Sequence, residues 1–381
     1  MKRQITDKRE DYKKKIEKLG FVFHDNYWNE GTYYEITNQE MQLIEEATKE
    51  CYKVACDTFD IMASEYKRGN TYIFNEFGFP DSVIARIVDS WYNDDLSLYG
   101  RFDFCLKDGR LKLYEFNADT PTSLLESSLI QWFWKEDVFP EYDQYNSIHE
   151  NLIQSWKDIS SEYNVKSLSV VSVQDNEEDL STSGYIASCA VDANLNVHQF
   201  DIEQLRFDDF GHMYNPDETP VEMLFKLYPT EWFFEENKDE LLKCSLRTMI
   251  EPLWKVIMSS KLFLVYMYKY FPECEYLLET YKLSDNKIGT NDVCIKPYYS
   301  REGENVTLTG NDGEQIEGTS GNYGEHLLIV QKKFCMPDFD GNHPVIGSWL
   351  IGGVPCGIGI RETKTLITDN MSMFVPHIIK D

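Results

Sequence analysis

One short stretch constrains the fold most: residues 101–119, RFDFCLKDGRLKLYEFNAD. Its two arms alternate between apolar and polar side chains, as strands with two different faces do. Asp108-Gly109 between the arms is a typical hairpin turn. The sequence therefore predicts a β-hairpin that carries an arginine, two carboxylates and an amide within seventeen residues.

The length of the hairpin loop decides which of these side chains meet. A two-residue loop places Asp103 and Glu115 on opposite faces of the ribbon, because a shift by one residue reverses the side chains of a strand. A three-residue loop that begins at Lys107 sets Arg101 opposite Glu115, and both then share a face with Asp103 and Asn117. We predict the second register. The aromatic side chains of the hairpin then pack behind that face: Phe102, Phe104, Tyr114 and Phe116.

The polar face of the hairpin has the chemistry of a cation site. Carboxylate and amide oxygens are ligands that Mg²⁺ accepts, and directly opposed residues lie about 5 Å apart. An arginine beside them can hold an anionic group that the metal also polarises. The alternative is an edge hairpin with one Arg–Glu cross-strand pair, worth a few tenths of a kcal/mol.

Charge excludes some partners. The 381 residues include 37 Lys and Arg against 65 Asp and Glu, a net charge of −28. Such a surface repels nucleic-acid phosphate and anionic membranes, so we expect neither as a partner. It attracts a cationic substrate such as a polyamine, and any phosphate site must be a local basic pocket.

Cysteine and histidine usage favours the cytoplasm. The nine cysteines are scattered without a Cys-x-x-Cys, and the seven histidines form no ligand-spaced cluster, so neither zinc nor disulfides are indicated. The N-terminal residues are charged throughout, unlike a signal peptide. The most apolar stretch, 262–268, is too short to cross a bilayer.

A β-α-β unit is predicted in the middle of the chain. Residues 167–173 have the pattern of a buried parallel strand, followed by an acidic loop at 174–179, a helix from Thr182 and a strand at 196–200. Ligands of such sheets lie beyond the carboxyl ends of the strands. The loop residues Glu177 and Glu178 are therefore candidate substrate contacts, and the alternative is a solvated acidic loop.

The C-terminal part carries basic residues at the ends of predicted strands. Lys296 ends the strand 292–297 and precedes a Gly-containing loop with Arg301, which suits nucleotide phosphates. The alternative is a polar hairpin. A mobile flap is predicted before the strand 326–334, and Arg361 ends a Gly-rich hairpin.

Together these stretches resemble the synthetase domain of the glutathionylspermidine synthase family of permuted ATP-grasp ligases, along essentially the whole chain. The matching segments are RFDFC…LKLYEFNAD, EPLWKVI…K, VCIKP…SREGENV and IGG…GIR. The resemblance implies a mixed α+β or α/β, circularly permuted ATP-grasp fold with an inserted β-α-β lobe that is pre-ATP-grasp-like. The implied lobes are 1–140 with the metal hairpin, 141–235 for substrate, and 236–381 for nucleotide with a flap at 298–325.

The resemblance also implies roles for individual residues. The implied magnesium ligands are Asp103, Glu115 and Asn117, and the catalytic arginines are Arg101, on the acyl phosphate and tetrahedral intermediate, and Arg361. The implied ATP contacts are Arg101, Lys261, Lys296, Arg301, Gly303 and Asn305, with Gln331 and Lys332 near the adenine.

The implied reaction is ATP- and Mg²⁺-dependent ligation of a small peptide-like acid to an amine, through an acyl phosphate. The family has Ser-x-Ser-Cys after Asn-Ala-Asp, and this chain has Thr120-Pro-Thr122-Ser123, which leaves the identity of the acid open. We expect no amidase domain, because the N-terminal helix leads directly into the synthetase part. Two alternatives are a catalytically silent nucleotide- or polyamine-binding module and a glycoside hydrolase that uses Asp103 and Glu115.

Overall fold

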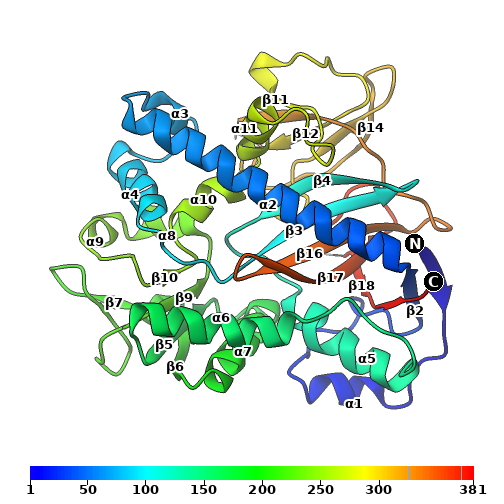
Figure 1. Ribbon diagram of the computed structural model, residues 1–381, viewed down its shortest axis with the longest axis horizontal. Helices are drawn as coiled ribbons and strands as arrows, with labels where there is room; N and C mark the ends of the chain where they lie inside the picture. The colour runs from blue at the N-terminus through cyan, green and yellow to red at the C-terminus, as the bar shows by residue number, and fades with distance from the viewer. Residues whose placement is uncertain (325–326, 370) are drawn as a thin grey trace.

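A central antiparallel sheet organises the molecule, which is a mixed α+β protein (Figure 1). The computed structural model describes residues 1–324, 327–369 and 371–381. The predicted hairpin pairs through its first strand with the C-terminal part of the chain. The strands of this sheet are, in spatial order, β18 (Met373–Val375), β17 (Val354–Thr363), β16 (His343–Ile351), β3 (Tyr99–Lys107) and β4 (Arg110–Asn117).

The hairpin has a two-residue loop, so the predicted three-residue loop is wrong. Lys107 pairs with Arg110, and the turn residues Asp108 (φ 52°) and Gly109 (φ 70°) are both left-handed, as a type I′ turn requires. A β-bulge near Asp103 then shifts the register by one residue. Asp103 therefore lies opposite Glu115, and the predicted pairing of Arg101 with Glu115 is wrong because Arg101 lies opposite Asn117.

The predicted shared face of the hairpin is confirmed, but it results from the bulge and not from a three-residue loop. Tyr114 is the extra residue of the bulge, since Phe104 pairs with Leu113. The prediction that Tyr114 packs behind the polar face is wrong, because its ring joins a small apolar cluster with Cys105 and Met336. Phe102 and Phe116 do stack behind the polar face, with ring centroids 3.9 Å apart.

One face of the central sheet is apolar and covered by helices. The long helix α2 (Asn38–Lys67) crosses this face in Figure 1 and packs on β16, β17 and β4. Its N-terminus has a capping box, in which Thr37 and Glu40 exchange hydrogen bonds. A buried hydrogen bond of 2.7 Å between the hydroxyls of Thr48 and Ser348 joins the helix to β16. The opposite face is left for polar groups.

Two further sheets flank the central one. The second five-stranded sheet has the order β11 (Thr280–Lys282), β15 (Leu328–Lys332), β12 (Val293–Pro297), β13 (Thr307–Thr309) and β14 (Gln315–Gly318). The third sheet is parallel, with the order β10 (Met249–Ile250), β9 (Leu224–Leu227), β5 (Ser167–Ser172) and β6 (Asn196–Asp201). The helices α6 (Ile148–Tyr163) and α7 (Glu177–Asp192) pack together beside this parallel sheet.

The remaining elements are short. Two small sheets are formed by β1 (Lys2–Ile5), β2 (Thr32–Ile36) and β19 (His377–Ile379), and by β7 (Arg206–Phe207) and β8 (Met213–Tyr214). The first of them brings the chain ends together in Figure 1. The other helices are α1 (Tyr12–Glu17), α3 (Tyr72–Asn75), α4 (Asp81–Tyr92), η1 (Glu126–Ile130), α5 (Gln131–Val138), η2 (Ile202–Gln204), α8 (Thr230–Glu236), α9 (Lys238–Leu241), α10 (Trp254–Ser259), α11 (Leu262–Tyr270) and η3 (Leu283–Asp285).

The predicted acidic loop is shorter than expected. Residues 177–179 form the first turn of α7, and the Asn176 side chain caps this turn by accepting hydrogen bonds from the backbone N–H groups of Glu178 and Asp179. Carboxylates are favourable there because they face the positive end of the helix dipole. The helix therefore begins before the predicted Thr182.

Two buried ion pairs anchor the open end of the hairpin, opposite its turn. Glu251 accepts hydrogen bonds of 3.0 Å from the backbone N–H groups of Leu98 and Tyr99, and it pairs with Lys255. On the other strand, the Nζ of Lys226 lies 3.1 Å from an oxygen of Asp119, and both side chains are at most 1% exposed. These contacts tie β3 to α10 and the end of β4 to the parallel sheet.

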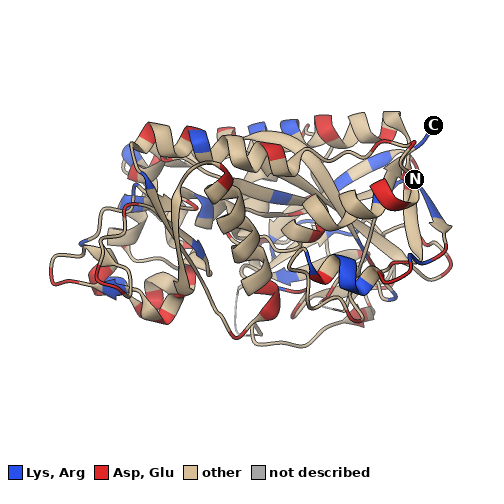
Figure 2. Ribbon diagram, turned by 90° about the horizontal axis from the view of Figure 1, so that it is seen from below, with Lys and Arg blue, Asp and Glu red and all other residues tan. Residues whose placement is uncertain are grey.

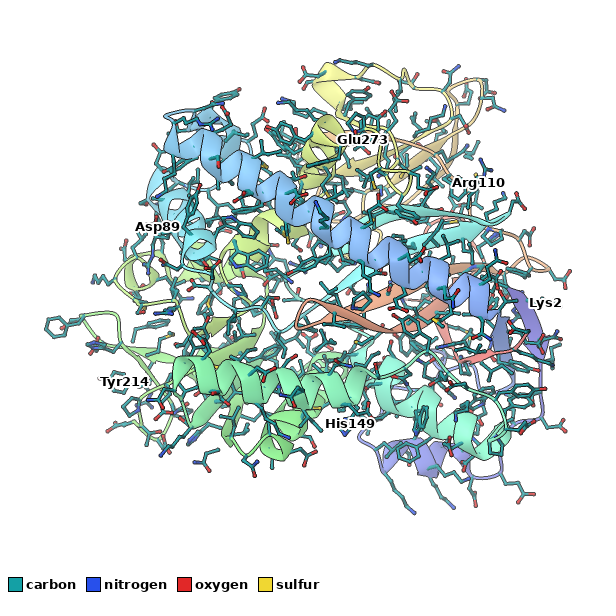
Figure 3. All side chains as sticks on the ribbon, viewed as in Figure 1. Lys2, Asp89, Arg110, His149, Tyr214 and Glu273 are labelled. Carbon is teal, nitrogen blue, oxygen red and sulfur yellow. The ribbon has the colours of Figure 1, made fainter. Side chains whose placement is uncertain are left out.

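Charge elsewhere lies mainly on the outside. Figure 2 shows Asp and Glu interspersed with Lys and Arg along helices and loops. Arg110, at the start of β4, is exposed at the outer end of the hairpin (Figure 3). No helix among the described residues is long and apolar enough to cross a membrane.

Replacement of Asp119 by Ala tests the anchor at the end of β4. It leaves the buried ammonium of Lys226 without a carboxylate, and we expect a loss of about 3–5 kcal/mol in the free energy of unfolding. Urea titration measures it. Glu45→Ala, which breaks a surface pair with Lys49, is the matched control and should cost at most about 1 kcal/mol. Equal losses in the two variants would contradict the anchor.

His377 should make the protein acid-sensitive. Its side chain is fully buried, and burial lowers its pKa to about 3. Below pH 6.5 the unfolded chain therefore binds a proton that the folded chain does not, and stability falls as the pH falls. Between pH 7 and 5 this amounts to about 2 kcal/mol for one group. In the His377→Gln protein, the free energy of unfolding from urea titrations should lose this part of its dependence on pH. If the free energy of unfolding changes with pH as it does in the wild type, the prediction for His377 is contradicted.

Candidate active site

A polar cavity lies between the two five-stranded sheets. Its volume is about 390 Å³. The walls come from β3, β4, β16 and β17 of the central sheet and from β12, β13 and β15 of the second sheet, with α7 and α8 at one side. The polar face of the hairpin forms part of this wall, so the face that the sequence predicted is directed into a cavity.

Arg101 and Asp103 form the most buried ion pair of the cavity. The Nε of Arg101 donates to Oδ1 of Asp103 at 2.6 Å, and Nη2 donates to Oδ2 at 3.0 Å. Burial lowers the pKa of Arg101, but Asp103 and Glu115 outweigh it and raise the pKa above its ordinary value. Arg361 approaches from β17, with Nη2 3.5 Å from Asp103. Two guanidinium groups therefore share one carboxylate.

Two lysines reach the hairpin from the other side of the cavity. The Nζ of Lys261 lies 3.1 Å from Glu115 and donates to the carbonyl of Ser300 at 2.8 Å. The Nζ of Lys296 donates to the carbonyl of Tyr114 at 3.0 Å, so the bulge supplies an acceptor for a strand lysine. Burial raises the pKa of Glu115, but both lysines outweigh it, and the pKa lies well below its usual range.

The hairpin acids and amide converge on one point. The Nδ2 of Asn117 lies 3.2 Å from an oxygen of Asp103 and 3.3 Å from an oxygen of Glu115. A flip of the amide would direct its oxygen to the same place. Two carboxylates and an amide oxygen fit Mg²⁺ when water or phosphate completes the shell. Among the described residues, no cluster of three or more His, Cys, Asp or Glu is arranged for a metal.

Arg301 connects the predicted flap to two other segments. It donates at 2.8 Å to the hydroxyl of Thr120 and at 2.8 Å to Glu231 on α8. Its guanidinium lies 5.5 Å from the ring centroid of Trp232. Nearby, a side chain at Gly303 would place its Cβ 2.2 Å from the carbonyl oxygen of Thr368, and φ is +70° there. Only glycine fits that position.

The far end of the cavity is largely apolar. Gln331 and Lys332 line it, and the Gln331 amide bonds Thr280 at 3.3 Å. The apolar lining comes from both sheets and the segment after β15: Leu278, Cys294, Leu308, Phe334, Met336 and Val345. Such a lining suits a flat ring.

Most of the sequence-predicted site residues line this one cavity, from six separate stretches of the chain. They are Arg101, Asp103, Glu115, Asn117, Thr120, Thr122, Glu178, Lys261, Lys296, Arg301, Gly303, Gln331, Lys332 and Arg361. Three others do not line it. Glu177 is exposed, Ser123 is buried with its hydroxyl bonded to Tyr27 at 2.7 Å, and the side chain of Asn305 accepts a hydrogen bond from the backbone of Tyr323.

Other lining residues were not predicted as site residues. Asp179 belongs to the predicted acidic segment 174–179, and the others are Tyr27, Glu231, Trp232 and Lys333. Lys333 directly follows the predicted site residue Lys332, and this adjacency was the signal in the sequence that could have indicated it. Burial and the adjacent Glu178 raise the pKa of Asp179 to about 6, a shift typical of functional sites. The other residues come from segments that only the folding of the chain brings here.

The cavity places a cationic cluster beside two carboxylates in a mixed α+β fold, an arrangement that suits anionic ligands such as phosphates and carboxylates. Comparison with protein families is more specific. Residues 3–380 match the family model "Glutathionylspermidine synthase preATP-grasp". The chain belongs to this family.

Individual relatives carry ligase and synthetase names. The chain is 33% identical to a "Putative acid--amine ligase" of Haemophilus influenzae, over 97% of each chain. It is 28% identical to the trypanothione synthetase of Crithidia fasciculata, over 80% of this chain and 50% of that protein. It is 24% identical to the bifunctional glutathionylspermidine synthetase/amidase of Escherichia coli, over 91% of this chain and 59% of that protein. The chain therefore spans about half to three-fifths of the length of these last two relatives.

Gly347 leaves room for the arginine of the hairpin, and its replacement should disturb the cavity. It lies opposite Asp103, and a Cβ there would come within 2.7 Å of the Cδ of Arg101. We expect Gly347→Ala to lower the free energy of unfolding by about 1–3 kcal/mol. In Gly184→Ala, the matched control within α7, the new Cβ meets no atom closer than 3.8 Å and should stabilise slightly. A Gly347→Ala protein as stable as the wild type in urea would contradict the close packing.

Proposed function

We propose that this chain is an ATP- and Mg²⁺-dependent acid–amine ligase, which forms an amide through an acyl phosphate. One observation carries the proposal: four cationic side chains converge on the two carboxylates of the hairpin within a single cavity, and Arg301 lines the same cavity. The four are Arg101, Lys261, Lys296 and Arg361. The ligase and synthetase names of the relatives support it.

We assign the two five-stranded sheets to an ATP-grasp fold in permuted order, with lobes at 1–140, 141–235 and 236–381. ATP lies between the sheets in this proposal. Its base occupies the apolar end beside Gln331 and Lys332, and Lys261 and Lys296 meet its phosphates. The flap residues near Arg301 cover the phosphates and exclude water.

Asp103, Glu115 and Asn117 would hold magnesium, which offsets the negative charge that builds on the transferred phosphoryl group. The donor set supports this assignment, because three oxygen-bearing side chains surround one point. Lys261, which now pairs with Glu115, would be free to bind the phosphates if Glu115 held the cation.

Arg101 and Arg361 bind the acid. A carboxylate is a poor electrophile, and phosphorylation converts one of its oxygens into a good leaving group. The two guanidinium groups beside Asp103 orient the substrate carboxylate and then stabilise the oxyanion that forms as the amine attacks. Their fixed geometry requires little reorganisation during the reaction.

The amine enters from the acidic side of the cavity. Glu178, Asp179 and Glu231 line that side and attract an ammonium group. We propose an amine of the polyamine class and a peptide-like acid. Thr120 and Thr122, which replace the family's serines, contact the acid.

Turnover of labelled ATP with a panel of acids and amines tests the proposal. Glutathione and spermidine are the first pair, because the E. coli relative is named for their product. We expect ADP release that requires both an acid and Mg²⁺. ATP binding without ADP release for any pair would instead indicate a catalytically silent module.

Glu115→Gln should weaken the response of ATP binding to magnesium. The substitution removes one carboxylate of the donor set and keeps the shape of the side chain. We expect ATP affinity in Mg²⁺ to fall about tenfold and ADP release to fall at least 100-fold. Isothermal titration and the ADP assay measure the two effects.

The matched control is Glu46→Gln on the exposed face of α2, which should behave as the wild type. Normal turnover of the Glu115→Gln protein would show that the hairpin does not hold the cation.

A further inference from the structure

Glu126 is a buried carboxyl group that the reaction described above does not use. It is the first residue of the π-helical turn η1 and is 0% exposed. Neither of its carboxyl oxygens has a hydrogen-bond partner among the described residues. A buried polar group without a partner costs free energy, so the position calls for an explanation.

The other polar side chains of this turn are satisfied. Ser127 donates to the carbonyl of Ser123 at 2.6 Å, and Ser128 donates to that of Leu124 at 2.8 Å. Gln131 donates to the carbonyl of Ile358 at 2.7 Å. The turn can therefore supply partners, and Glu126 alone among these four side chains is left without one. π-Helical turns also occur frequently at functional sites.

Three groups of the cavity wall surround Glu126. Burial and the charge of Glu178, from α7, raise its pKa to about 8, while Tyr27, from the N-terminal segment, and Arg361, from β17, lower it. All three of these neighbours line the cavity. The carboxyl group therefore lies just behind the wall where the amine enters and titrates close to neutral pH.

Tyr27 is the connection between Glu126 and the cavity. Its hydroxyl shares a hydrogen bond of 2.7 Å with Ser123, which follows the loop proposed to contact the acid. Ser123 in turn begins the turn that contains Glu126, because its carbonyl accepts the hydrogen bond from Ser127. Burial and the charge of Glu126 both raise the pKa of Tyr27. A hydroxyl can accept one proton and donate another, so it can pass a proton through the wall.

We propose that Glu126 accepts, through the hydroxyl of Tyr27, the proton that the substrate ammonium must lose before it attacks. The inference rests on the proposed function, because it assigns Glu126 a role in the attack of the amine on the activated acid. An ordinary exposed carboxylate is too weak a base for an ammonium group, and the buried site makes Glu126 a stronger one.

The step balances as follows. The O–H of Tyr27 first turns from Ser123 toward Glu126. The ammonium then gives a proton to the oxygen of Tyr27 while the phenolic proton moves to the carboxylate of Glu126. The freed nitrogen lone pair forms the C–N bond to the acyl carbon, and the C–O bond to phosphate breaks with its electron pair. The second nitrogen proton leaves with the phosphate, and Glu126 later releases its proton to solvent through Tyr27.

The first test needs no substrate. Glu126 holds its proton in the folded protein at pH values where the unfolded chain has lost it, so the contribution of Glu126 to the wild-type free energy of unfolding should fall as the pH rises from 5 to 8. Glu126→Gln removes this dependence, and its melting temperature should rise relative to the wild type across that range. Ser128→Ala, in the same turn, should keep the wild-type dependence. A difference between wild type and Glu126→Gln that does not change with pH would overturn the inference.

The second test compares two nucleophiles, with glutathione as the acid. Spermidine must lose a proton before it attacks, whereas hydroxylamine is largely unprotonated at neutral pH. Glu126→Gln and Tyr27→Phe should each lower amide formation with spermidine about 100-fold and hydroxamate formation less than threefold. ADP formation in the presence of hydroxylamine should remain close to wild type.

The outcomes separate the two proposals. Equal losses with both nucleophiles would assign Glu126 a merely structural role and overturn this inference alone. No ADP from the wild type with any acid would overturn the proposed function, and this inference with it.

Discussion

Two buried ion pairs hold the base of the hairpin, and the positions of the hairpin's polar groups in the cavity depend on them. Glu251 and Lys255 fix the start of β3, while Asp119 and Lys226 fix the end of β4. A buried charge without its partner is costly, so neither end can move independently of the helix or sheet that it contacts. The hairpin is thereby a rigid support on which Arg101 and the carboxylates keep their geometry.

Within the cavity, a continuous series of ion pairs and hydrogen bonds connects side chains from its two sides. Arg361 and Arg101 meet Asp103, the amide of Asn117 bridges the two carboxylates, and Lys261 pairs with Glu115 from the other side. In the absence of substrate these charges satisfy one another. We infer that the phosphates and carboxylates of the substrates replace some of these contacts. The charged side chains are therefore already in place before substrates bind, so the site is preorganised.

The sequence analysis predicted the shared face of the hairpin correctly, but it attributed that face to a three-residue loop and not to a bulge. Period-two alternation shows which residues share a face within each arm, but it does not reveal a bulge in the middle of one arm. Tyr114 was therefore misplaced. The acidic segment after β5 was predicted as a loop, because the composition of a helix's first turn resembles that of a loop. The roles of the cavity residues, including Asn305 and Glu177, stay predictions.

The sequence by itself determined the residue types, the alternation of the hairpin and the strand lysine Lys296, since these depend on neighbours along the chain. The tertiary structure decided which distant groups meet: Arg361 beside Asp103, Glu231 beside Arg301, and Glu126 buried behind Tyr27. Burial and electrostatic neighbours come from segments that pack together only when the sheets form. For that reason the raised pKa of Glu126 has no counterpart in any local pattern of the sequence.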